Sequence, residues 1–240
     1  NVVFAGTNKG LLRSENKGTS WTRALGVSEE ALGSFLDSAT SKYYVGTMSG
    51  VFVSSDAGKT FTKYFSPSGI KLRQFTGGRD AKGMTLAFMD NDGANACAWA
   101  NTWSSSEGAA NVAATKAACG YVWVTNSSGT FTKTSQAAGD HLKMAENDSE
   151  TIYTTGARAW VRQYGTKVHV SHDKGVSWKL KLNQLDYDTN PFKPWPSNLL
   201  EWSAVALDVG WWDNGYESFE INRRNSDMVA GSGYFFLHAT

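Results

Sequence analysis

The chain has 240 residues, with 23 Lys and Arg against 22 Asp and Glu, so its formal net charge is +1 when His is neutral. This balance gives no bulk attraction to nucleic acid or to an anionic membrane, and no apolar run approaches the roughly 20 residues of a membrane-spanning helix. Charged residues make up 19% and aromatic residues 13% of the chain, which excludes a disordered chain and a charged coiled coil. We therefore expect neither nucleic acid nor a membrane as a partner.

A hairpin pattern recurs along the chain. Residues 2–7 and 11–14, on either side of Gly10, have the composition of two short strands joined by a turn. Similar patterns begin at residues 43, 85, 152 and 228. The first intervals are about 40 residues long, which is typical of an architecture built from repeated small sheets. Together with 24 Gly and 10 Trp residues, this repeat predicts an all-β fold with many tight turns.

A turn of constant chemistry follows four of these hairpins. Complete copies occupy residues 54–61 and 171–178, a copy with Asn in place of Asp occupies residues 14–21, and a copy shorter by one residue occupies residues 125–131. The Asp or Asn side chain can accept hydrogen bonds from backbone N–H groups of its own turn, the Gly takes a positive φ, and the aromatic residue that follows packs under the hairpin. This turn resembles the Asp box, or bacterial neuraminidase repeat, Ser-x-Asp-x-Gly-x-Thr-Trp.

The resemblance implies a β-propeller of four-stranded blades, with about four to five blades present and about six to eight in the complete ring. It also implies that Asp56 and Asp173 have structural rather than catalytic roles. We expect residues 1–240 to form a single, incomplete propeller domain, which further polypeptide would complete. The innermost strands, which face the central channel, are expected at residues 34–37, 72–75, 142–145 and 218–221.

Three insertions interrupt the repeats, at residues 91–118, 157–166 and 182–217. Cys97 and Cys119 bracket most of the first insertion. A disulfide between them would stabilise the fold by about 3 kcal/mol, and the alternative is two free thiols that pack as small hydrophobes. No Cys or His spacing is typical of a zinc site, and we expect neither a metal nor a cofactor.

Aromatic residues concentrate in and beside the insertions, where a propeller binds its ligands. The C–H faces of a pyranose ring lie flat on Trp and Tyr rings, so we predict that a polysaccharide or oligosaccharide is the partner. Residues 194–233 are similar to one blade of the xyloglucanase-type endoglucanases. The candidate sugar-binding residues are Trp160, Trp195, Trp202, Trp211, Trp212 and Tyr216.

Hydrolysis of a glycan needs two carboxylates on either side of the bond that is cut. Asp208 and Asp213 border the Trp-rich segment and are the first candidates, while Asp90 is a further acidic residue near a loop. Each of these side chains has a structural alternative, in which it caps a turn. A sialidase, a relative by architecture, is not favoured because its Arg-Ile-Pro motif is absent from the chain.

A polysaccharide lyase, another relative by architecture, would need a base and a cation that neutralises the uronate carboxylate. His141 and Lys143 lie on an expected innermost strand, and Arg158, Arg162 and Tyr164 lie in the next insertion. The alternative for His141 is a polar channel or turn residue. A third hypothesis is a propeller that binds a glycan or a protein without catalysis. We expect a secreted, extracellular or periplasmic carbohydrate-active protein, with glycoside hydrolysis ahead of β-elimination.

Overall fold

The computed structural model describes residues 2–90, 120–126, 128–139, 141–155, 167–183, 218–222, 225–232 and 237–239. Within these ranges, all regular structure is β-strand, and 18 strands form five antiparallel sheets. In chain order the strands are β1 (Val3–Thr7), β2 (Gly10–Ser14), β3 (Thr22–Arg23), β4 (Ala31–Asp37), β5 (Lys42–Thr47), β6 (Gly50–Ser54), β7 (Thr62–Phe65), β8 (Leu72–Asp80), β9 (Gly83–Asp90), β10 (Tyr121–Thr125), β11 (Phe131–Ala137), β12 (Leu142–Met144), β13 (Ile152–Thr155), β14 (Lys167–Ser171), β15 (Lys179–Asn183), β16 (Ser218–Asn222), β17 (Asn225–Ser232) and β18 (Leu237–Ala239).

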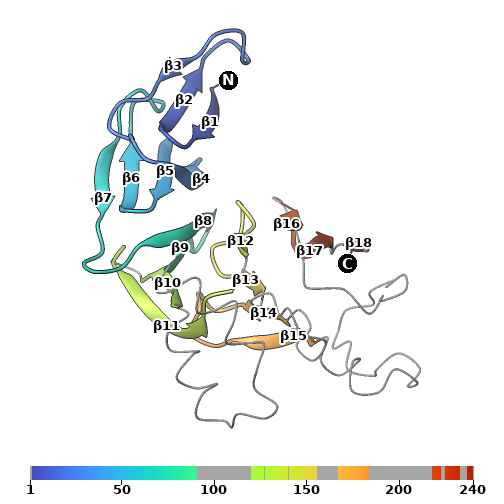
Figure 1. Ribbon diagram of the computed structural model, residues 1–240. Coiled ribbons are helices and arrows are strands. Elements are labelled where there is room, and N and C mark those ends of the chain that lie inside the picture. The colour runs from blue at the N-terminus through green and yellow to red at the C-terminus, as the bar shows by residue number, and fades with distance from the viewer. Residues whose placement is uncertain are drawn as a thin grey trace.

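Each sheet is a meander of consecutive strands, and we number the sheets as blades in chain order. Blade 1 contains β1–β3, blade 2 contains β4–β7, blade 3 contains β8–β11, blade 4 contains β12–β15 and blade 5 contains β16–β18. Figure 1 shows the blades arranged around a common centre, with β4, β8, β12 and β16 innermost and the later strands of each sheet farther out. The chain is therefore an all-β propeller, and the predicted innermost strands are confirmed.

The boundaries of two predicted segments need correction. The third insertion was expected to begin at residue 182, but β15 continues to Asn183 in register with β14. The last hairpin pattern was expected to begin at residue 228, but Asn225 already pairs with Asn222, so β17 begins there. In both places backbone pairing extends the strand beyond the limit that the side-chain pattern indicated.

The hydrophobic core is divided into layers that lie between neighbouring blades. On β9, Leu86 and Phe88 pack with residues of blade 2 such as Phe35, while the alternate residues Ala87 and Met89 pack with residues of blade 4. All four side chains of this stretch of β9 are fully buried. Successive side chains of a strand point to opposite faces, so a strand between two blades must be apolar at every position.

The innermost strands of adjacent blades run side by side in the same direction. Gly33 of β4 approaches β8 so closely that an added Cβ atom would lie 2.1 Å from the carbonyl oxygen of Phe75. Four residues farther along both strands, the Arg79 Nη2 atom donates to Asp37 at 2.8 Å. The Arg79 backbone N–H in turn donates at 3.0 Å to the carbonyl oxygen of Glu146, just beyond β12. These contacts fix which residues of β4, β8 and β12 share one level of the channel.

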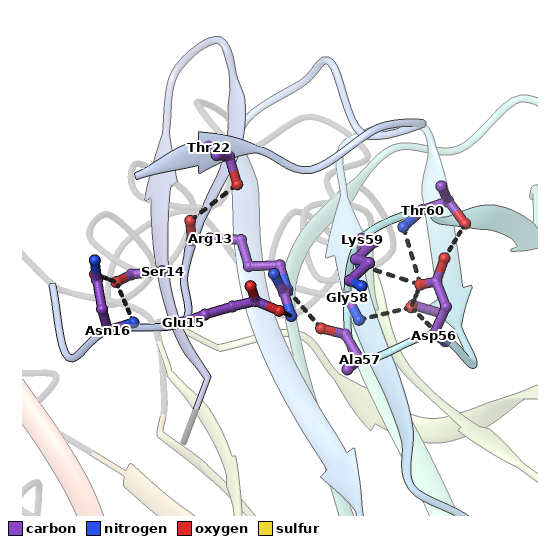
Figure 2. Close-up of polar contacts among 11 residues, drawn as sticks. Arg13, Ser14, Glu15, Asn16, Thr22, Asp56, Ala57, Gly58, Lys59 and Thr60 are labelled. Atoms are coloured by element: carbon purple, nitrogen blue, oxygen red, sulfur yellow. Dashed lines mark hydrogen bonds and ion pairs between the residues drawn. The ribbon is translucent and has the colours of Figure 1, made fainter. Parts of the chain in front are cut away.

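The turns that resemble Asp boxes lie at the outer side of the blades, and each is closed by its own side chains. In blade 2 the Asp56 Oδ1 atom accepts hydrogen bonds from the backbone N–H groups of Lys59 and Thr60, both at 3.0 Å, and Oδ2 accepts from the Thr60 hydroxyl at 2.6 Å. The Ser54 hydroxyl oxygen accepts from the Gly58 N–H at 2.9 Å. Figure 2 shows these bonds within one compact turn.

The other turns repeat this arrangement with one instructive variation. Asp173 accepts from the backbone N–H and the hydroxyl of Ser177 at 2.9 and 2.5 Å. Asn16 accepts from the Ser20 N–H at 2.9 Å but donates its amide N–H to the Ser20 hydroxyl, so the second bond is reversed in direction. Asn126 closes the shortened turn by the same backbone bond. The predicted side-chain bonds to the turn backbone are therefore present in all four copies.

The aromatic residue that ends each turn was predicted to pack under its hairpin, and this holds for some of the copies. Phe61 is buried and Trp178 packs on the core between blades 3 and 4, as expected, but Trp21 remains 40% exposed. The difference follows from position, because no described blade precedes blade 1. A second link between blades comes from Arg13 of blade 1, whose Nε–H donates to the Ala57 carbonyl oxygen at 2.6 Å (Figure 2).

Candidate functional site

A cavity of about 550 Å³ lies among the innermost strands. Its walls contain residues 30–35 at β4, residues 73–77 of β8, residues 141–144 at β12, Glu146 and Ile221 of β16. Four blades therefore contribute to it, and it occupies the channel of the propeller. We call it the channel cavity. Its volume lies in the range of small-molecule binding sites, which are about 300–1,000 Å³.

The polar side chains of the channel cavity come mostly from two adjacent strands. Arg73 and Gln74 lie on β8, and His141 and Lys143 lie at and beside the start of β12. All four side chains are partly exposed, so they combine packing against the wall with access to the cavity. Adjacent innermost strands thus bring cationic, titratable and amide groups from distant parts of the sequence into one wall.

A side-chain hydrogen bond sets the register between these two strands. The Gln74 Oε1 atom accepts a hydrogen bond from the backbone N–H of Leu142 at 2.7 Å. Arg73 is therefore one residue before this bond on β8. On the other strand, His141 and Lys143 are the residues on either side of Leu142. The Leu142 side chain is 2% exposed and anchors β12 in the core behind the cavity wall.

Two carboxylates lie at opposite ends of the channel cavity. Glu30 precedes β4 and belongs to the end at which the innermost strands begin, while Glu146 follows β12 and lies at the level of Arg79. Both residues are exposed. The described part of the channel therefore contains carboxylates as well as cations and an imidazole, the group types that glycan-cleaving enzymes use.

The structure places two of the predicted catalytic residues, His141 and Lys143, in the wall of the channel cavity. The other predicted site residues lie outside the described residues: Asp208, Asp213, Arg158, Arg162, Tyr164, Trp160, Trp195, Trp202, Trp211, Trp212 and Tyr216. Cys97 and Cys119 also lie outside them, so the disulfide remains a prediction.

Four cavity residues with charged or amide side chains were not among the predicted site residues. They are Glu30, Arg73, Gln74 and Glu146. For Arg73 and Gln74 the sequence contained a usable signal, because both lie in the stretch predicted as an innermost strand. Glu30 and Glu146 flank such strands, and only the three-dimensional register places them at the ends of the cavity.

Asp90, a further acidic candidate, has a structural role. Its side chain is 3% exposed, Oδ1 accepts from the Tyr121 N–H and Oδ2 accepts from the Trp123 indole N–H, each at 2.7 Å. Gly120 packs so closely that an added Cβ atom would lie 1.7 Å from Oδ1. The carboxylate therefore joins the end of β9 to the start of β10, and nothing in this geometry gives it access to a substrate.

Asp37 and Arg79 form an ion pair between blades 2 and 3 at the end of β4. Burial works against ionisation of Asp37, but hydrogen bonds from Thr40 and Arg79, together with the charge of Arg79, outweigh it and hold the pKa of Asp37 below its ordinary value. Asp37 is 1% exposed, and its carboxylate accepts hydrogen bonds from the Thr40 hydroxyl and from the Arg79 guanidinium. The pair stabilises the contact between blades beside the cavity.

The described ranges contain no group of three or more His, Cys, Asp or Glu side chains placed to hold a metal ion. The part of the chain that the structure describes also contains no helix long and apolar enough to cross a membrane.

No family model and no curated protein matches the sequence of the chain. Solved structures of propeller proteins match its fold. A glycoside hydrolase family 74 enzyme from Niastella koreensis has a TM-score of 0.60 at 17% identity, over 98% of this chain and 34% of that one. An ancestral family 74 enzyme has a TM-score of 0.53 at 11% identity, over 100% of this chain and 29% of that one. A chain of the nidogen/laminin complex has a TM-score of 0.55 at 14% identity, over 100% of this chain and 73% of that one.

The chain spans about a third of the length of the two family 74 enzymes. At these identities the matches establish the β-propeller fold and leave the activity open, because unrelated functions share one propeller scaffold.

Proposed function

We propose that the protein binds a polysaccharide across the channel cavity and cleaves it by glycoside hydrolysis with two carboxylates. The observation that carries the proposal is the channel cavity itself, because it lies where a propeller presents its innermost strands and its lining includes the carboxylates Glu30 and Glu146. The Trp-rich segment that contains Asp208 and Asp213 supplies the sequence argument for a sugar ligand. Two of the proteins with a similar fold are glycoside hydrolases.

The chemistry requires one carboxylic acid that protonates the leaving oxygen and one carboxylate that activates water or attacks the sugar carbon. Glu30 and Glu146 are candidates within the described channel, and Asp208 and Asp213 are candidates from the sequence. Because Glu30 and Glu146 lie at opposite ends of the cavity, each would act with Asp208 or Asp213 rather than with the other. Trp and Tyr rings would hold the sugar faces, while polar side chains of the cavity bind the hydroxyl groups.

The test is incubation of the protein with neutral β-glucans and with uronate polymers, with new reducing ends as the readout. Hydrolysis produces reducing ends without an unsaturated product. The variants Glu30→Gln, Glu146→Gln, Asp208→Asn and Asp213→Asn identify the carboxylates, because loss of a catalytic acid or base lowers the rate by about 100-fold or more. Reducing ends that fail to appear with every polymer would contradict the proposal, and full activity in all four variants would contradict the site.

A second candidate function is β-elimination on a uronate polymer, and the placement of His141 and Lys143 in one wall favours it. In this reaction His141 takes the proton from carbon 5, the bond between carbon 4 and the glycosidic oxygen breaks, a C4=C5 double bond forms, and the leaving oxygen receives a proton. Lys143 would neutralise the uronate carboxylate. The product absorbs ultraviolet light through its unsaturated uronate, which hydrolysis products lack.

The same digestion therefore separates three outcomes. Reducing ends alone indicate hydrolysis, reducing ends with ultraviolet absorption indicate elimination, and a Trp fluorescence change without cleavage indicates a binding propeller. For elimination, His141→Ala should abolish the absorbing product, while His172→Ala, in an outer turn, should leave it unchanged. Equal loss in both variants would remove His141 from the mechanism.

We also propose that the protein acts outside the cytoplasm, where polysaccharides are encountered. A disulfide between Cys97 and Cys119 is compatible with an oxidising compartment. Thiol titration of the denatured protein with and without reductant tests the disulfide: two thiols that appear only after reduction support it, and two thiols without reductant contradict it.

A further inference from the structure

Cationic side chains gather where blades 3 and 4 meet at the channel cavity. Arg73 of β8 and Lys143 of β12 both line the cavity, and the bond from the Leu142 N–H to Gln74 holds their two strands in register. His141, on the other side of Leu142, lines it as well. We call Arg73 and Lys143, together with the imidazole of His141 beside them, the cationic wall, and its two positive charges are those of Arg73 and Lys143.

The cationic wall contrasts with the chain as a whole. The formal net charge of all 240 residues is only +1, which by itself gives no preference for an anionic ligand. The two carboxylates of the cavity lie at its ends. Glu30 precedes β4 of blade 2, and Glu146 lies at the level of Arg79, near the end of β8. Arg73 and Lys143 therefore place two positive charges on one wall, while the carboxylates of the described lining lie at the two ends of the cavity.

A planar guanidinium and an ammonium in a concave wall are suited to a carboxylate. Arg presents its N–H donors in a fork that matches two carboxylate oxygens, and Lys adds a point charge that adapts to position. Hydrogen bonds between charged groups are about twice as strong as neutral ones, and a partly enclosed site weakens their screening by solvent. A sugar that has only hydroxyl groups would use neither cation fully.

We propose that the cationic wall is a subsite for the carboxylate of an acidic sugar, so that the substrate class is a uronate-containing polysaccharide. The inference rests on the proposed function, because it assumes that the channel cavity binds a glycan. It holds for either cleavage chemistry, since it concerns which sugar is recognised. The cavity volume of about 550 Å³ leaves room for neighbouring neutral sugar units beside the uronate.

The test compares short galacturonate and glucuronate oligosaccharides with their methyl esters by isothermal titration calorimetry. Esterification removes the negative charge and leaves the ring unchanged. The acid should bind at least about tenfold more tightly than its ester, and Arg73→Met or Lys143→Met should each weaken the acid by about tenfold while changing the ester little. Lys63→Met is the matched control, because it removes one cation from the exposed outer strand β7. Arg73→Lys keeps the positive charge. Retained affinity for the acid in this variant would show that Arg73→Met acts through loss of the charge and not through misfolding.

The outcomes separate the inference from the proposed function. Equal affinity for acid, ester and neutral glucan would overturn the uronate inference and leave glycan binding in place. Absence of binding to every glycan would overturn both. An equal effect of Lys63→Met would also overturn the inference, because the preference would then reflect total charge. Polyglutamate that binds as tightly as the uronate, with the same dependence on Arg73, would show that the wall recognises an acidic peptide instead.

Discussion

Gln74 and Leu142 connect the innermost strands of two adjacent blades: the Gln74 side-chain oxygen accepts the Leu142 backbone N–H at 2.7 Å. The two strands belong to different sheets, so ladder pairing does not set their register. This bond lies between Arg73 on one strand and His141 and Lys143 on the other. A single amide side chain thus positions groups of the channel wall.

Replacement of Gln74 by Met removes the acceptor at nearly constant side-chain size. The Leu142 N–H then lacks this partner at a partly buried position, so we expect the free energy of unfolding to fall by about 1–3 kcal/mol. Gln74→Glu retains an acceptor oxygen and should lose less. Urea denaturation of both variants measures the difference. A Met variant as stable as the unmodified protein would show that packing alone fixes the two strands.

The Asp37–Arg79 pair predicts a specific loss of stability in acid. The pKa of Asp37 is lowered in the folded protein, so its contribution is complete above the unfolded value near pH 4 and is lost as the pH falls through the lower folded value. At pH 7, Asp37→Asn should reduce the free energy of unfolding by about 2–3 kcal/mol, because it leaves Arg79 without its carboxylate. The difference from the unmodified protein should shrink below about pH 4.

Urea denaturation between pH 7 and pH 2 measures this dependence. Glu150→Gln is the matched control, because Glu150 pairs with the exposed Lys82, where solvent screens the ion pair and little stability should be lost. A difference between Asp37→Asn and the unmodified protein that stays constant with pH would contradict the assignment.

Asp173 should tolerate Asn better than Ala. Asn16 occupies the equivalent position in blade 1 and closes its turn by a reversed bond to Ser20. Asp173→Asn should therefore retain most of the turn, while Asp173→Ala leaves the Ser177 N–H and hydroxyl without their acceptor and should cost about 1–2 kcal/mol. Thermal unfolding compares the two. Equal midpoints for Asn and Ala would mean that these bonds contribute nothing.

Gly58 should be sensitive to a methyl group for two reasons. Its φ is 77°, and an added Cβ atom would lie 2.1 Å from the Phe4 ring of blade 1. Gly69 has a similar φ of 76°, but its added Cβ atom would meet nothing within 4 Å. Gly69→Ala should therefore cost about 1 kcal/mol from backbone strain alone, and Gly58→Ala should cost more. Equal losses by thermal unfolding would show that Phe4 moves aside without cost.

The sequence predicted the repeated hairpins and the turns well, because both depend on local chemistry. Alternating apolar residues define strands, and a Ser, Asp and Gly at fixed spacing define a turn wherever they occur. The positive φ of Ala57, at 58°, was not foreseen, since the pattern assigns that conformation to Gly58 alone. It follows from the path of the turn, which places two successive residues in the left-handed region.

The channel wall was harder to predict because it depends on the register between blades. Arg73 and Lys143 are far apart in the sequence, and only the contacts of β8 with β12 bring them to one cavity. A strand pattern specifies which residues share a face, but it does not specify their level relative to another sheet. The Trp-rich segment was prominent in the sequence, yet the described wall contains a cation cluster rather than Trp side chains.

The most direct test of glycan binding in the channel is hydrogen–deuterium exchange with and without each polysaccharide of the digestion panel. At least one glycan should slow exchange in residues 31–37, 72–80 and 142–144, which form the innermost strands, and leave the outer strand residues 62–65 and 131–137 unchanged. Protection confined to the outer strands, or no protection with any glycan, would contradict the account.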